Sequence, residues 1–135
     1  MRKAYSIIAM AFTIILSSCG DEDVKFYKQH SDNLEKLAVL IASDATITDA
    51  CCIKDRCFNP QALELMQKLN LECLRKDTSD GTVNFILGNR GKKLESTEIV
   101  YLYQRELGEP KEYLKAGISI KKVNANWFVR KYGFD

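Results

Sequence analysis

Cysteines are the residues of this sequence whose types and spacing most clearly predict chemistry. Four of the five cysteines follow one another closely, as Cys51, Cys52, Cys57 and Cys73. An even number of cysteines in an exported domain predicts disulfides. Adjacent cysteines rarely bridge each other, so we expect one of Cys51 and Cys52 to pair with Cys57 and the other with Cys73. A thiolate metal site is the alternative, although "CCIKDRC" lacks the C-x-x-C pairs of zinc modules, and one pair of free buried thiols is a further alternative.

Other residue types give no pattern that predicts catalysis. The single histidine, His30, falls on the apolar side of a predicted helix and is expected to be structural. The sequence has no G-x-S-x-G or H-E-x-x-H motif and no nucleotide-binding fingerprint. "GNRGKK", residues 88–93, could bind an anion, but a solvated hairpin tip explains it better. The acidic side chains near the end of the chain are interpreted as solvated surface groups: Glu95, Glu98, Glu106 and Glu109. We therefore expect a protein that is not an enzyme, with no catalytic residue and no metal.

The first residues have the composition of an export signal. Met1-Arg2-Lys3 is a cationic start, and thirteen uncharged residues, 4–16, follow it. As a helix this segment would be about 20 Å long, short of the roughly 30 Å hydrocarbon core of a bilayer. A charged start, a short apolar region and small residues behind it predict a signal peptide rather than a membrane span.

The sequence Leu16-Ser17-Ser18-Cys19 resembles the lipobox of bacterial lipoproteins, in which an aliphatic residue and two small residues precede an obligatory cysteine. The resemblance implies that residues 1–18 are a signal peptide cleaved before Cys19. It also implies a diacylglyceryl thioether on the Cys19 sulfur and an acyl chain on the new amino group. Apart from this covalent lipid, no cofactor is expected. A chance cysteine in an ordinary cleavage region is the alternative.

A lipid on Cys19 would make the membrane the first partner of this protein. Two or more acyl chains hold a protein stably on a bilayer without a spanning helix. Gly20, rather than aspartate, after the cysteine resembles the outer-membrane sorting signal of many Gram-negative bacteria. Residues 19–24 are rich in acids and are predicted to be a solvated, lipidated tether. We expect the protein in the bacterial cell envelope, on the outer membrane facing the periplasm.

The mature chain has the size of one domain and a balanced charge. Removal of residues 1–18 from 135 leaves 117, and residues 25–135 are predicted to be a single globular domain. Arg2 and Lys3 leave with the signal, which takes the 20 basic residues to 18 against 18 acidic ones. Without a basic tract, no nucleic-acid partner is expected.

Hydrophobic periodicity predicts an α+β fold. Apolar residues three and four apart predict a helix over 25–42, and Asn59-Pro60 starts a second helix over 60–70. A cysteine-bearing loop, 44–58, lies between them. Alternating patterns and turn residues then predict these strands: 71–76, 83–87, 99–104, 118–123 and 127–132. We expect two N-terminal helices packed on an antiparallel sheet of four or five strands.

Aromatic residues in the last predicted strand are candidates for binding a protein partner. Alternation turns outward either Trp127 with Val129, or Phe128 with Arg130 and Tyr132. Tryptophan, tyrosine and arginine on an exposed sheet face are the usual anchors of protein interfaces. Trp127, Phe128, Arg130 and Tyr132 are therefore the candidate partner-binding residues, with a purely structural sheet as the alternative.

The segments "EIVYLYQREL", "PKEYLKAG" and "NWFVRKYGF" resemble, in their order, a diffuse group of small bacterial envelope lipoproteins, some of which are immunity proteins. The resemblance implies a membrane-anchored, non-enzymatic protein that binds a protein partner, as an inhibitor or immunity protein that neutralises an envelope-acting toxin. The alternative is a structural or assembly accessory of an envelope secretion or transfer machine.

Overall fold

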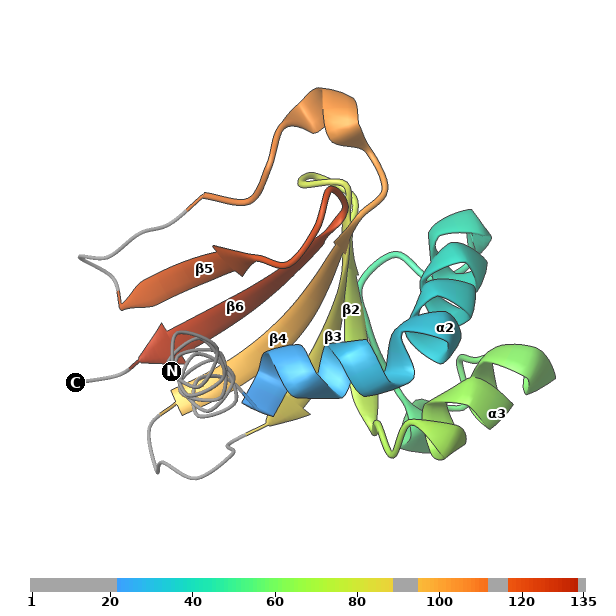
Figure 1. The fold of residues 1–135 in the computed structure, drawn as a ribbon. Helices are drawn as coiled ribbons and strands as arrows, with labels where there is room; N and C mark the ends of the chain where they lie inside the picture. The colour runs from blue at the N-terminus through green and yellow to red at the C-terminus, as the bar shows by residue number, and fades with distance from the viewer. Residues whose placement is uncertain (1–21, 89–94, 112–116, 134–135) are drawn as a thin grey trace, which may run out of the picture.

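The fold is built on one antiparallel sheet of six strands (Figure 1). The structure is a computed structural model that describes residues 22–88, 95–111 and 117–133. Its strands lie in the order β1-β2-β3-β4-β6-β5. Their bounds are Ala50–Cys52 for β1, Cys73–Asp77 for β2, Thr82–Gly88 for β3, Glu95–Leu102 for β4, Ile118–Lys122 for β5 and Trp127–Gly133 for β6. Each neighbouring pair is antiparallel, so short turns suffice to connect β2 to β3 and β5 to β6.

Helix α2 (Glu22–Ser43) lies across one face of the sheet, and α3 (Pro60–Lys68) packs against α2 (Figure 1). The backbone of α2 leaves the helical conformation at His30, with φ −119° and ψ 15°, so the helix bends there. Leucines and isoleucines of α2 and α3 meet the inward residues of the strands in the main core, which includes Leu34, Leu37, Met66, Phe85 and Trp127.

Lys76 joins the sheet to the end of α2. Its buried ammonium group donates hydrogen bonds to the carbonyl oxygens of Ala42 at 3.1 Å and Asp44 at 2.9 Å. These carbonyls lie at the C-terminal end of α2, where helices leave acceptors unpaired and carry partial negative charge. A lysine from the sheet therefore supplies the cation that the last turn of α2 lacks in its own sequence.

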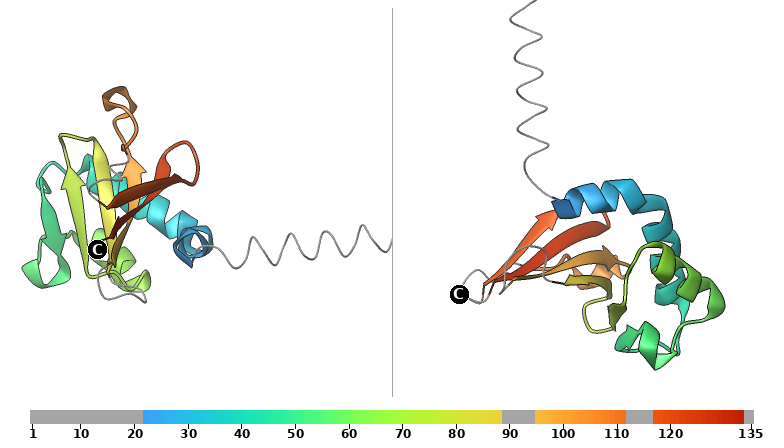
Figure 2. Two further views of the ribbon diagram at one scale, coloured as in Figure 1. Left: turned by 90° about the vertical axis from the view of Figure 1, so that its left-hand side faces the viewer. Right: turned by 90° about the horizontal axis from the view of Figure 1, so that it is seen from below.

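The other face of the sheet, called the open face below, carries a second and smaller core. The sheet twists so strongly that β5 and β6 run at a wide angle to β2 and β3 (Figure 2, left). On this face Val100, Leu102 and Phe128 are buried together, with Ile120 of β5 packed against them. The twist therefore shields a face that no helix among the described residues covers.

The predicted number of strands and order of elements were wrong. The sheet has six strands rather than four or five, and only α2 precedes the first strand, since β1 lies between the two helices. The additional strand, β1, has three residues and falls in the predicted loop 44–58. A strand this short shows no alternation, and it forms because Ala50, Cys51 and Cys52 pair with β2. The α+β class is confirmed.

The helix begins inside the predicted tether. Residues 22–24 of the predicted tether 19–24 are the first turn of α2, whereas residues 19–21 lie outside the described residues. Glu22 and Asp23 favour this start because carboxylates stabilise the positive end of a helix. Asp23 also pairs with Lys131 of β6 at 3.5 Å, which fixes the start of α2 to the sheet.

Candidate functional site

A cluster of polar side chains, most of them buried, lies on the open face of the sheet. It consists of the partly exposed Arg75 on β2 and of the buried Asn84 on β3, Glu98 on β4 and Arg130 on β6, and is here called the charged cluster. Glu98 forms ion pairs with both guanidinium groups, with oxygen–nitrogen distances of 3.5 Å to Arg75 and 3.4 Å to Arg130. Arg130 also donates to the side-chain oxygen of Asn84.

Strand register explains why these residues meet. Glu98 lies directly opposite Arg130, and Asn84 lies opposite Arg75, so the four side chains share one face. The amide of Asn84 is held in turn by the Arg75 carbonyl and the Thr82 hydroxyl, at 3.2 and 3.0 Å. Its oxygen is therefore directed to Arg130, whose guanidinium carbon lies 5.7 Å from the centre of the Tyr132 ring.

The charged cluster contains two cations and one anion. Burial acts to lower the pKa of Arg75, but the charge of Glu98 and a hydrogen bond with Tyr132 outweigh it, and the pKa is raised. Arginine stays protonated in proteins, so both guanidinium groups keep their charge. Within the part of the chain that the structure describes, the Nε atoms of Arg75 and Arg130 are also buried without a hydrogen-bond partner. The cluster is thus short of hydrogen-bond acceptors.

A cavity of about 320 Å³ opens beside Arg130. Its walls are Thr82 and Ile118 from the sheet, Asp80 from the β2–β3 turn, and the segment 107–111, which begins at the last residue of the short 3-10 helix Arg105–Leu107. Leu107 and Lys111 of this segment are exposed to solvent, and Leu107 is 52% exposed. The cavity thus has an arginine, Arg130, in its wall and an apolar side chain, that of Leu107, among its exposed lining residues.

Gly81 positions two walls of this cavity. Its carbonyl accepts hydrogen bonds from the backbone amides of Tyr103 and Gln104, at 2.9 and 3.2 Å, which ties the β2–β3 turn to the segment before the 3-10 helix. Gly81 has φ +67°, and a β-carbon there would collide with the Gln104 side chain. Only glycine meets both conditions without strain.

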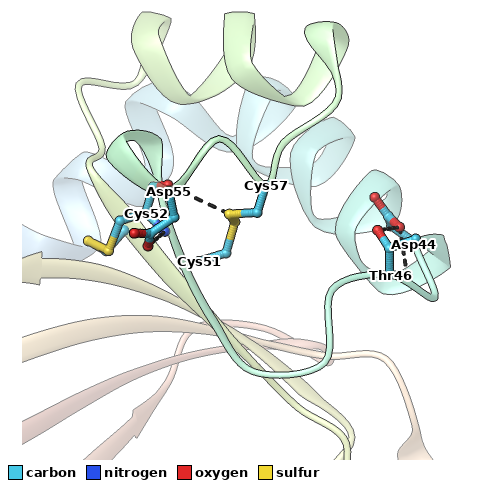
Figure 3. Close-up of a disulfide and its surroundings, with 7 residues drawn as sticks. Asp44, Thr46, Cys51, Cys52, Asp55 and Cys57 are labelled. Carbon is cyan, nitrogen blue, oxygen red and sulfur yellow. Dashed lines mark hydrogen bonds between the residues drawn. A yellow bond between two sulfur atoms is a disulfide. The ribbon is translucent and has the colours of Figure 1, made fainter.

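The cysteines form two disulfides, Cys51–Cys57 and Cys52–Cys73, which is one of the two pairings left open by the sequence. Figure 3 shows Cys51 and Cys57 joined, with Cys52 beside them. Successive residues of a strand point to opposite sides, and Cys51 of β1 points into the main core. Cys52 lies directly opposite Cys73 of β2, with 4.0 Å between the α-carbons. The backbone amide of Cys52 donates to Asp55 at 3.1 Å, which closes the intervening 3-10 turn. One disulfide therefore joins the loop after β1 to β1, and the other joins β1 to β2 at the edge of the sheet.

The four candidate partner-binding residues lie on both faces of the sheet. Trp127 faces the helices: its ring nitrogen donates to Glu35 of α2 at 2.9 Å and it is only 2% exposed. Phe128, Arg130 and Tyr132 share the open face, where Phe128 is a core residue and Tyr132 is half-buried. Of the four, only Arg130 lines the cavity.

Sequence reasoning missed the acidic member of this site. Glu98, interpreted as a solvated surface group, has a side chain that is only 7% exposed. Its signal was available in the alternation of β3, where Thr82 and Asn84 put polar groups on the side opposite Val83 and Phe85. A buried strand with polar residues on one side indicates polar partners on its neighbours.

Other chemical candidates have no converging partners in the described part of the chain. His30 is half-buried at the bend of α2, with its ring centre 4.6 Å from that of Phe26. No group of three metal-ligating side chains occurs within residues 22–88, 95–111 and 117–133. Within the same ranges, no helix has the length and apolar composition needed to cross a membrane. Cys19 and most of the segment 88–93 lie outside the described residues.

Comparisons with known proteins add no assignment. No protein family, curated protein or solved structure matches this chain.

Proposed function

We infer that this chain is a lipid-anchored protein of the bacterial envelope that binds a protein partner and neutralises it, as an inhibitor or immunity protein. The sequence Leu16-Ser17-Ser18-Cys19 supports the lipid anchor, and Gly20 supports sorting to the outer membrane, facing the periplasm. The two disulfides agree with export, because they persist in oxidising compartments.

The cavity beside Arg130 is the observation that carries the binding role. It combines an arginine, which is enriched at the centre of protein interfaces, with the exposed side chain of Leu107. Among the described residues no base, nucleophile and orienting group converge there, so binding fits this site better than catalysis.

Fatty-acid labelling tests the anchor. We expect the intact chain to incorporate a clickable fatty acid in a Gram-negative host, and Cys19→Ala to incorporate none because the thiol acceptor is missing. Ser17→Ala is the matched control: it keeps a small residue two positions before the cysteine and should be labelled normally. Continued labelling of Cys19→Ala would refute the anchor.

Affinity purification tests the binding role. The tagged mature lipoprotein, extracted with detergent from envelopes of its own host, should retain one partner in a stoichiometric complex and inhibit that partner's activity. Recovery of a multi-protein secretion or transfer machine would instead favour the assembly-accessory alternative. Recovery of no specific protein would refute both.

A further inference from the structure

We propose that the cavity beside Arg130 is a carboxylate-binding site, and that Arg130 is the residue that recognises the carboxylate. The cavity volume of about 320 Å³ is at the lower end of the range for ligand sites and fits an acidic side chain or a small organic acid. The source expected from the proposed function is an acidic residue or chain end of the protein partner, and this part of the inference rests on that function.

The charge of the site favours an anion. Arg130 shares the carboxylate of Glu98 with Arg75, so its guanidinium has only part of one counter-charge, whereas Asp77 also acts on the partly exposed Arg75. Arg130 is 9% exposed, and its Nε atom has no hydrogen-bond partner among the described residues. Burying a cation without full pairing costs free energy, so a bound anion would stabilise the cluster and would itself be bound more tightly.

Other lining residues decide which anion fits. Asp80 and Glu109 also line the cavity, and Glu109 is paired with Lys122 at 2.6 Å. Asp80 adds a negative charge to the lining, and the exposed Lys111 adds a positive one. A carboxylate carries one charge and matches the planar guanidinium, whereas a doubly charged phosphate would be repelled more strongly by Asp80.

Leu107 allows the site to distinguish a carboxylate of a protein partner from that of a free organic acid. Leu107 is 52% exposed, one of two exposed large hydrophobic residues in the described part of the chain, and it lines the cavity. A peptide with apolar residues next to its acid can cover Leu107, but a free diacid cannot. We therefore expect peptide binding to depend on both Arg130 and Leu107.

The test is a titration of the mature lipoprotein, purified in detergent with ¹⁵N-labelled arginine and observed by NMR at the arginine Nε–H groups. The probes are glutarate, the blocked peptide acetyl-Leu-Glu-Leu-amide and its isosteric control acetyl-Leu-Gln-Leu-amide. We expect the acidic peptide to shift the Arg130 Nε–H resonance and the glutamine peptide to leave it unchanged. Leu107→Ser should weaken the acidic peptide and leave glutarate unaffected. Equal binding of glutarate and the acidic peptide, without an effect of Leu107→Ser, would support the site and assign it to a free organic acid.

Substitutions identify the recognising residue. Arg130→Gln should weaken the acidic peptide at least about tenfold, which corresponds to 1.4 kcal/mol. Arg105→Gln is the matched control, because Arg105 is an exposed arginine on the neighbouring 3-10 helix and bonds only the Ala125 carbonyl in the described structure. This variant should bind the acidic peptide with the affinity of the wild type. Should Arg130→Gln fail to fold, Lys111→Glu on the exposed rim should still weaken binding several-fold, more at low salt than at high salt.

Two results would overturn the inference. The first is an Arg130 Nε–H resonance that neither acid shifts at millimolar concentration. The second is a natural partner that wild type and Arg130→Gln capture equally well, which would remove the cavity from the interface and leave the proposed function standing. Absence of any partner, together with peptide binding at Arg130, would instead refute the proposed function and retain the site.

Discussion

The charged cluster allows a quantitative test of how this fold tolerates buried charge. We expect Glu98→Gln to lower the free energy of unfolding by about 3 kcal/mol, the lower end of the range for removing one partner of a buried ion pair. The reason is that the buried Arg130 and the partly exposed Arg75 would both lose their shared counter-charge. We take the lower end because the Arg75 side chain is 34% exposed and can be partly solvated.

An exposed ion pair of the same length is the matched control. Lys68 and Glu64 of α3 are also 3.4 Å apart, but their side chains are 58% and 68% exposed. Glu64→Gln should therefore cost no more than about 0.5 kcal/mol. Both variants can be measured by urea denaturation with the disulfides intact, followed by the fluorescence of the single tryptophan, Trp127, which is buried in the main core.

A double-mutant cycle separates charge pairing from other effects. The double variant Glu98→Gln/Arg130→Gln should be more stable than the sum of the two single effects predicts, by about 1 kcal/mol or more, because it removes both charges of one pair. The reasoning fails if Glu98→Gln costs as little as Glu64→Gln, or if the two single effects simply add.

Three further predictions concern the framework around the site. Lys76→Met should cost about 1–3 kcal/mol in urea denaturation, because it removes two charge-assisted hydrogen bonds at the end of α2. Replacing the Cys52–Cys73 disulfide by two serines should cost about 3 kcal/mol, as expected for closing a loop of this length, and should shift the urea midpoint down without preventing export. The hydrogen bond from the Ser79 hydroxyl, with hydrogen bonds from backbone amides, lowers the pKa of Asp77. The ionised carboxylate therefore stabilises the fold at any pH above the ordinary aspartate pKa of about 3.9, and this stabilisation is lost as the pH falls through the lowered pKa. Urea midpoints measured below about pH 4 should therefore fall less steeply in Asp77→Asn than in the wild type. An identical pH dependence would contradict that assignment.

Local patterns predicted the regular elements because those elements depend on neighbouring residues. Asn59 caps α3 by accepting from the Ala62 amide at 2.7 Å, and Pro60 follows it as the sequence indicated. The strands with clear alternation were found for the same reason. By contrast β1, with three residues, exists only because β2 lies beside it, and a contact 21 residues away leaves no local signal.

The site was harder to predict because its residues become neighbours only through strand order. Arg130 was named as a candidate from its residue type. Its position beside Glu98 depends on the pairing of β6 with β4, a strand distant in sequence, in addition to its hairpin partner β5. The same pairing buries Phe128 against Val100. Alternation gave two possible faces for Arg130, and only the packing of Trp127 on α2 decides between them.

Strand alternation also separates the start of the domain from its candidate binding site. Lys131 pairs with Asp23 of α2, on the side of the sheet that the helix covers, and the preceding residue, Arg130, points to the open face. The cavity opens on the other side of β6, so the start of α2 and the candidate binding site do not share one surface.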